Sequence, residues 1–155
     1  MARAFTRVLV PVDFSRGNAA ALEAVARLRG RGGSLRVYIV HAIDPASAAV
    51  GIPAATWANL LGQLETAGRH AVERLVARAR KRLGAGTRVQ GLIVHGTPAD
   101  AICRIAKRLR ADVIVIGTHG RTGLAHALLG SVAERVVRLA GRPVLTVPIR
   151  SRARR

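Results

Sequence analysis

The most regular feature of this sequence is the alternation of short apolar runs with longer amphipathic stretches. Each apolar run is rich in β-branched and aliphatic residues, which is typical of β-strands. The run DVIVI at 112–116 is almost continuously apolar, as expected for a strand covered on both faces of a parallel sheet. Five strands are predicted, at residues 5–12, 34–42, 87–95, 112–116 and 144–147.

Helical periodicity separates these strands, with apolar residues recurring at steps of three and four. Helices are predicted over 18–29, 54–83, 98–109 and 131–140. The third has a favourable start, because Thr97 suits the N-cap and Pro98 the first helical position. We expect the long helix to bury Leu61, Leu64, Gly68, Ala71, Leu75 and Ala79, the third helix Ile102, Ile105, Ala106 and Leu109, and the last helix Val132, Val136 and Leu139.

The order of elements is therefore β-α-β-α-β-α-β-α-β. Strands that alternate with helices imply right-handed crossovers and an open parallel sheet with helices on both faces, an α/β fold. The length of 155 residues suits one domain, and no linker or repeat divides it. We expect a single domain over residues 1–149, followed by a basic tail at 150–155.

Composition excludes several other classes. Half of the residues are hydrophobic and 22% are charged, which excludes disorder of the whole chain. The single cysteine, Cys103, excludes an internal disulfide framework, and we expect it to be buried and inert. No apolar run reaches the ~18 residues that span a membrane, and the first residues do not resemble a signal peptide. We expect a soluble, cytoplasmic protein without membrane contact.

The net charge of +18 is unusually high, although it carries no information about the fold. The basic residues are nearly all arginine, since Lys81 and Lys107 are the only lysines. This balance favours nonspecific contact with nucleic acid or another polyanion. The alternative is a compositional bias, because alanine, glycine and arginine are abundant together. Aromatic residues make up only 3%, so stacking platforms for single-stranded nucleic acid are scarce.

Candidate chemistry lies after the strands, because open parallel sheets bind ligands beyond the carboxyl ends of their strands. Gly117, Gly120, Gly123 and Gly130 follow the fourth strand and precede a helix that begins at Ser131. Glycines let the backbone approach a phosphate, and a helix start presents free N–H groups to an anion. On this spacing alone, a phosphate cradle and a plain glycine-rich turn are both open.

Asp13 follows the first strand and has two possible roles. Its carboxylate can accept hydrogen bonds from ribose hydroxyls, or it can cap the first helix together with Ser15. The sequence contains neither a GxxxxGK[ST] phosphate loop nor the dinucleotide fingerprint GxGxxG after the first strand. The five histidines show no metal-ligand spacing, and no catalytic arrangement is evident, so no catalytic or metal-binding residues are predicted.

Several segments together resemble the ATP-binding branch of the universal stress protein family. These are Gly117-x-x-Gly120, nine residues and Gly130-Ser131, continuing into VAERV at 132–136 and RPVLTVP at 142–148. VLVPVDFS at 8–15 and VHAID at 40–44 also match, in the right order. The resemblance covers about residues 5–149. It implies a five-stranded parallel sheet of order 3-2-1-4-5, usually in a dimer formed here through the C-terminal strand.

The resemblance also implies an ATP site, with Mg²⁺ carried by the nucleotide. The adenosine would be lined by Pro11, Val12 and Asp13, with Asp13 near the ribose. The main chain of Ala42 would meet the adenine edge, and Ile116 and Gly117 would flank the nucleoside. The phosphates would be surrounded by Gly120, Arg121, Gly130, Ser131 and Val132.

The resulting hypothesis is an ATP-binding stress-response protein that acts as a nucleotide-dependent switch for an unidentified protein partner. ATP would order residues 118–129 and change a surface that the partner reads. Two alternatives remain at this point: an arginine-rich module that binds nucleic acid, and a slow ATPase.

Overall fold

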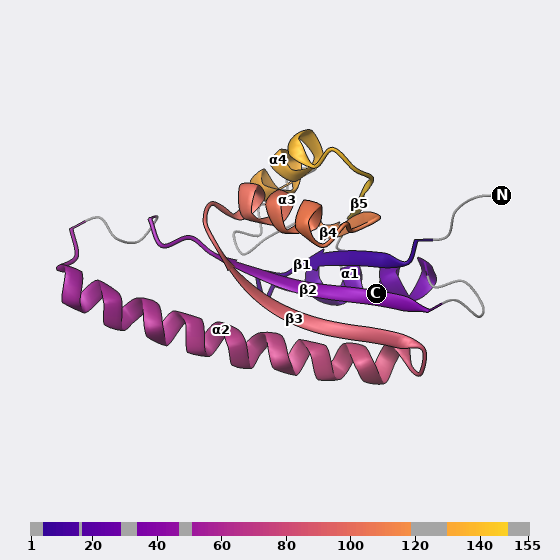
Figure 1. The fold of residues 1–155 in the computed structure, drawn as a ribbon, viewed down its shortest axis with the longest axis horizontal. Coiled ribbons are helices and arrows are strands. Elements are labelled where there is room, and N and C mark those ends of the chain that lie inside the picture. Colours follow the sequence, from indigo (N-terminus) through magenta and orange to yellow (C-terminus); the bar gives the residue numbers. More distant parts are fainter. Residues whose placement is uncertain (1–4, 16, 29–33, 47–50, 119–129, 149–155) are drawn as a thin grey trace, which may run out of the picture.

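The structure, a computed structural model, describes residues 5–15, 17–28, 34–46, 51–118 and 130–148. The basic tail at 150–155 lies outside these ranges, as do Gly120, Arg121 and Gly123. Within them, strands and helices alternate as predicted (Figure 1). In chain order the elements are β1 Arg7–Pro11, α1 Gly17–Leu28, β2 Leu35–Ile43, α2 Ala54–Leu83, β3 Thr87–His95, α3 Pro98–Arg108, β4 Val113–Gly117, α4 Ser131–Leu139 and β5 Val144–Val147.

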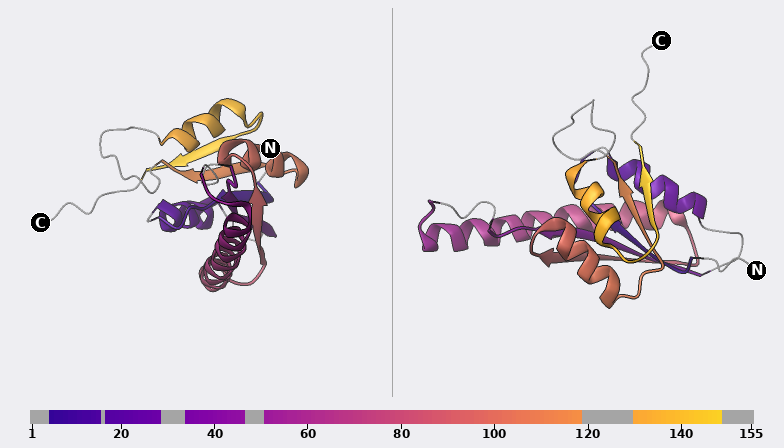
Figure 2. Two further views of the ribbon diagram at one scale, coloured as in Figure 1. Left: turned by 90° about the vertical axis from the view of Figure 1, so that its left-hand side faces the viewer. Right: turned by 90° about the horizontal axis from the view of Figure 1, so that it is seen from above.

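The described strands form one sheet, in which every pairing is parallel and the order is β3-β2-β1-β4-β5. Helices α1 and α2 cover one face, and α3 and α4 cover the other (Figures 1 and 2). Side chains of the central strand β1 alternate between the two faces: Val8 and Val10 pack toward α1 and α2, and Leu9 packs toward α3 and α4. The predicted α/β fold and strand order are confirmed.

The predicted buried face of α2 is partly wrong. The helix buries Gly68, Val72, Val76, Ala79 and Leu83, whereas the side chain of Leu64 is 43% exposed. The reason is length, because 30 helical residues span about 45 Å and the nine residues of β3 span only about 30 Å. Figure 1 shows α2 continuing past the end of the sheet, and none of residues 54–67 is buried.

The prediction for α4 also needs correction, whereas Ile102, Ile105 and Ala106 of α3 are buried as expected. In α4, Val136 is buried, but Val132 and Leu139 are exposed. The buried row of α4 instead runs through Ala133, Val136 and, just beyond the helix, Ala140. These positions are three and four apart, so one narrow stripe of this nine-residue helix faces the core.

Cys103 is half-buried rather than buried. Burial and the nearby Asp100 carboxylate raise the pKa of the thiol, and the charge of Arg142 opposes them. A raised pKa keeps the sulfur in the less reactive thiol form. Among the described helices, none combines the length and the apolar character that a membrane crossing needs.

Asp112 joins the beginnings of β1 and β4. Its Oδ2 accepts hydrogen bonds from the N–H groups of Thr6 and Arg7, each at 2.8 Å, and from the Thr6 hydroxyl at 2.9 Å. Burial alone would raise the pKa of Asp112. These three hydrogen bonds and the positive charge of Arg7 outweigh burial and hold the pKa below its ordinary value. The ionised carboxylate therefore stabilises the folded state.

We expect Asp112→Ala to lower the free energy of unfolding by about 1–3 kcal/mol, because two backbone donors lose their acceptor. Since the folded-state pKa is lowered, the stabilisation is fully present above the unfolded-state pKa of about 4. The stabilisation is lost as the pH falls through the folded-state pKa.

Urea unfolding at neutral and acidic pH measures both effects of Asp112→Ala. The variant should lose less stability in acid than the wild type, and Glu73→Ala, at an exposed carboxylate on α2, should behave as the wild type. Equal acid sensitivity of the wild type and Asp112→Ala would contradict this assignment.

Candidate functional site

A cavity of about 310 Å³ opens at the carboxyl ends of β1, β2 and β4. From β1 the chain adds β2 and β3 on one side, and then crosses back to add β4 and β5 on the other, so the sheet reverses its direction of growth between β1 and β4. Crevices at such reversal points are the usual ligand sites of open parallel sheets. The cavity is lined by every predicted site residue that the structure describes: Pro11, Val12, Asp13, Ala42, Ile116, Gly117, Gly130, Ser131 and Val132.

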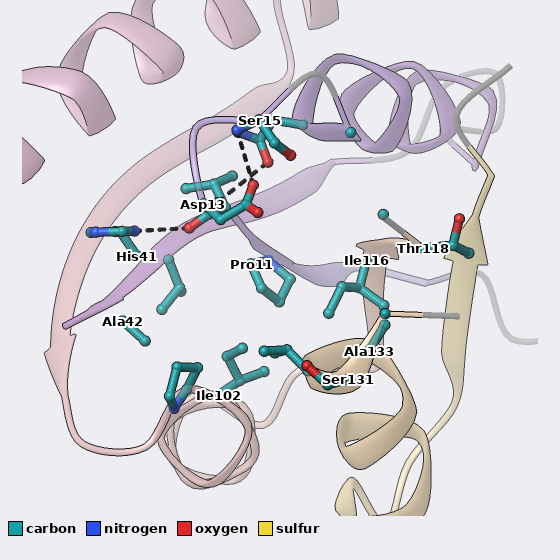
Figure 3. A pocket seen from close by; sticks show the side chains of 18 residues that line it. Pro11, Asp13, Ser15, His41, Ala42, Ile102, Ile116, Thr118, Ser131 and Ala133 are labelled. Atoms are coloured by element: carbon teal, nitrogen blue, oxygen red, sulfur yellow. Dashed lines mark hydrogen bonds between the residues drawn. The ribbon is translucent and has the colours of Figure 1, made fainter. Parts of the chain in front are cut away.

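The wall contributed by β1 and its following turn is held by hydrogen bonds. Asp13 Oδ1 accepts the N–H of Ser15 at 3.0 Å, and Asn18 Oδ1 accepts the N–H of Asp13 at 3.4 Å (Figure 3). One carboxylate oxygen thus shapes the turn that precedes α1, although it accepts no N–H from the described residues of the helix itself. Among the described residues, the other oxygen of Asp13 accepts no hydrogen bond and can receive one from a ligand. Ser15 Oγ is buried beside it, also without a partner in the described part of the chain.

The same turn is tied to the end of β2. Phe14 has φ of 64°, a left-handed conformation that costs a residue with a side chain about 1–2 kcal/mol. Its ring packs against the imidazole of His41, with ring centroids 4.4 Å apart. His41 Nδ1 lies 2.9 Å from the carbonyl oxygen of Val12, and because a carbonyl only accepts, Nδ1 carries the hydrogen. These contacts hold the strained turn beside the cavity.

Gly117 at the end of β4 has a packing role. A Cβ at this position would lie 3.3 Å from the Cα and the carbonyl oxygen of Gly17, which begins α1. Both neighbours are backbone atoms and cannot rotate away. The close approach of α1 to β4 therefore depends on residue 117 being glycine. The sequence pattern attributed Gly117 to ligand binding alone and missed this contact.

The N-terminus of α4 forms the opposite wall. The N–H of Gly130 donates to the carbonyl of Thr118, and the N–H of Thr118 donates to the carbonyl of Val147 at 3.0 Å. The start of α4 is thereby fixed to the end of β4. Gly130 precedes the helix in an extended conformation, with no side-chain cap.

The first N–H groups of α4, those of Ser131, Val132 and Ala133, have no acceptor within the helix. All three residues line the cavity. Unpaired N–H groups and the positive end of the helix dipole attract an anion. The described lining residues include no lysine or arginine, and Asp13 is their only acidic residue. The attraction for an anion therefore comes from the helix start.

Several lining residues were not predicted from the sequence. Ile102, from the second turn of α3, lies near Pro11 and Ile116 in Figure 3, and these side chains give the cavity an apolar part. The rule that parallel strands end at one edge also applies to the helix starts that follow them, so α1 and α3 could have been included. The residues missed are Ser15, Gly17, Asn18, Val40, His41, Pro98, Ile102, Thr118 and Ala133. Among the described residues, no group of three or more His, Cys, Asp or Glu side chains is arranged to hold a metal ion.

Comparison with known proteins gives consistent matches along nearly the whole chain. The model of the universal stress protein family matches residues 4–148. Universal stress protein MJ0531 of Methanocaldococcus jannaschii is 34% identical over 146 residues, which cover 92% of this chain and 82% of that protein. The solved structure of hypothetical protein MJ0577 superposes with a TM-score of 0.84 at 29% identity, covering 97% of this chain and all of that one.

A solved relative carries a nucleotide. The universal stress protein from Archaeoglobus fulgidus, in complex with dAMP, superposes with a TM-score of 0.59 at 26% identity, covering 94% of this chain and 99% of that chain. The matched family model spans the sheet, all four described helices and both walls of the cavity. The chain belongs to the universal stress protein family.

Proposed function

We propose that this protein binds ATP in the cavity between β1, β2, β4 and the start of α4. The observation that carries the proposal is the set of N–H groups at residues 131–133 that have no acceptor within α4, which line a cavity whose other part is apolar. A nucleotide has the same division, with an apolar base and charged phosphates. The dAMP-bound relative supports the assignment of the ligand class.

The proposed orientation follows from the chemistry of the two parts. The adenine would occupy the apolar part beside Ala42 and Ile116, and the ribose hydroxyls would donate to Asp13. The phosphates would accept from the backbone N–H groups of Ser131, Val132 and Ala133 and from the Ser131 hydroxyl, next to Gly130, whose own N–H donates to Thr118. Bound Mg²⁺ would come with the triphosphate and keep most of its waters. Gly120 and Arg121 belong to the same proposal and lie outside the described residues.

Calorimetry with ATP and with Mg²⁺-ATP tests the site directly. The double variant Gly130→Ala/Ser131→Ala removes a hydroxyl and adds a methyl group at the proposed phosphate site. The loss of one such hydrogen bond and a shifted helix start should weaken ATP binding by roughly tenfold or more. Gly62→Ala/Thr66→Ala makes matched changes on the exposed part of α2 and should bind as the wild type. If purified wild type, free of nucleic acid, gives no heat with either ligand, the proposal is wrong.

We also propose that ATP acts as a regulatory ligand in a stress response. A ligand shifts a conformational equilibrium only by its differential affinity for the two states. Limited proteolysis with and without ATP tests this idea at residues 118–129, most of which lie outside the described ranges. Identical cleavage rates under both conditions would exclude a switch in that segment, even where calorimetry detects binding.

A homodimer through β5 is a separate proposal. β5 is an edge strand, and Leu145 on it is 37% exposed. Val137 and Leu139 of α4 are also exposed, at 47% and 49%. Apolar side chains beside an unpaired strand edge favour pairing with a second strand. Sedimentation equilibrium should give a dimer for the wild type and a monomer for Leu145→Lys, and a monomeric wild type would refute the proposal.

A further inference from the structure

A second concave surface lies between α1 and α2, the two helices that cover one face of the sheet. This groove encloses about 450 Å³. Its apolar residues include Leu22 of α1, Leu75 of α2 and Phe14, whose ring is 37% exposed. The groove is lined by Phe14, Ser15, Asn18, Ala19, Leu22, Glu23, Ala71, Arg74, Leu75, Arg78, Ala79 and Arg82.

Two arginines of the groove have no partner in the described part of the chain. Arg74 and Arg78 make neither an ion pair nor a hydrogen bond there, whereas Arg82 donates to Glu23 at 2.9 Å. Residues four apart lie on the same side of a helix, about 6 Å apart along its axis. The groove therefore presents two adjacent free guanidinium groups beside apolar side chains.

Two other arginines beside β3 are engaged by the fold itself. Arg80 donates to the carbonyl of Val89 at 3.0 Å, and Arg104 donates to the carbonyl of His95 at 2.7 Å. These two arginines serve the fold by satisfying carbonyl groups of β3. Arg74 and Arg78 satisfy no such group among the described residues, so their charges are available to an acidic partner.

The chain itself does not supply a suitable occupant for this groove. Its eight acidic residues are far apart in the sequence. The closest two, Glu65 and Glu73, are separated by eight positions. The tail at 150–155 is basic, and a second copy would bring the same net charge of +18. Repulsion between like charges disfavours both as ligands of two arginines. Charge complementarity points to a different, acidic protein.

We propose that this groove docks a short segment of a partner protein in which acidic side chains flank large apolar ones. The carboxylates would pair with Arg74 and Arg78, and the apolar side chains would cover the exposed ring of Phe14 and the partly buried Leu75, with the buried Leu22 forming the floor of the groove. A nucleic acid would satisfy the arginines but would leave the apolar part of the groove uncovered. The groove also shares Ser15 and Asn18 with the nucleotide cavity, so a docked segment would touch the turn that forms the wall of that cavity.

Fluorescence anisotropy with a labelled peptide, Gly-Asp-Glu-Leu-Leu-Asp-Glu-Phe-Gly, tests this proposal without any nucleotide. We expect saturable binding at physiological salt. Arg74→Glu/Arg78→Glu should weaken it by about tenfold or more, because each favourable charge pair becomes a repulsive one. Arg69→Glu/Lys81→Glu changes the net charge by the same amount on the same helix, outside the groove, and should bind the peptide within about twofold of the wild type.

A second peptide separates the groove from general attraction between opposite charges. Replacing the two leucines and the phenylalanine by serine keeps the peptide charge and removes its apolar side chains, and should abolish saturable binding. Equal binding of both peptides would overturn the proposal, as would equal loss in the two double variants. Tighter binding of an oligothymidylate that depends on Arg74 and Arg78 would assign the groove to nucleic acid instead. Thermal unfolding of each variant checks that the exposed substitutions leave the fold intact.

Discussion

Ser131→Asp should nearly abolish ATP binding and should at the same time stabilise the protein slightly. The two effects have the same origin. A carboxylate at the first residue of α4 interacts favourably with the positive helix end, by about 0.5 kcal/mol, and Gly130 supplies no side-chain cap of its own. The same carboxylate would occupy the proposed phosphate position.

The loss of ATP affinity should be large. Two like charges 4 Å apart repel by about 4 kcal/mol at the effective dielectric constant of a protein surface, and partial solvent screening leaves an expected loss of roughly a hundredfold. Ser131→Asn is the matched control, since it keeps the size without the charge. Adenosine, which has no phosphate, should bind Ser131→Asp about as well as it binds the wild type. If adenosine and ATP lose affinity equally, the phosphates do not lie at the start of α4.

Gly91→Ala should lower the free energy of unfolding by about 1–3 kcal/mol. Gly91 lies in β3 directly beneath α2, paired with Ile39 of β2. An added Cβ would overlap Val72 Cγ1 and would lie 3.1 Å from Val76 Cγ2. Both valines are buried, at 3% and 8% exposure, so neither can move without displacing α2 from the sheet.

Gly62→Ala, in α2 itself, is the opposite case. Nothing lies within 4 Å of the position of its added Cβ, and the residue is in a helix interior. The substitution should stabilise the protein by about 0.5–1 kcal/mol. Thermal unfolding measures both variants, with an expected shift of about 2–4 °C for each kcal/mol. A Gly91→Ala protein as stable as the wild type would show that α2 is not seated on β3 at this point.

Sequence periodicity was sufficient for the order and type of the elements. The limits of α2 were predicted correctly because Pro53 and Gly84 flank an unbroken helical pattern. The edge of the sheet that carries the site followed from one rule about parallel strands, which placed Asp13 and Ser131 on the same cavity. These features depend on local residue preferences and on topology alone.

The features that were missed depend on the relative placement of elements. Leu64 fits a helical stripe, yet it is exposed, because α2 is longer than the strand β3 on which it packs and extends past the end of that strand. The sequence pattern assigns Gly117 to a loop motif. It does not indicate the contact of Gly117 with Gly17, which lies a hundred positions away in the sequence. The hydrogen bond from His41 to Val12 crosses between two strands in the same way. Periodicity along a chain contains no information about such distances.

The central position of β1 has a consequence for synthesis on the ribosome. Val8 pairs on one side with Val37 of β2, which emerges soon afterwards, and on the other with Val113 of β4. At about 5–20 residues per second, β4 follows β1 by roughly 5–20 s. During that interval Leu9, fully buried in the finished fold, has neither β4 beside it nor α3 above it. The nascent protein thus exposes the centre of its future core until most of the chain has been made.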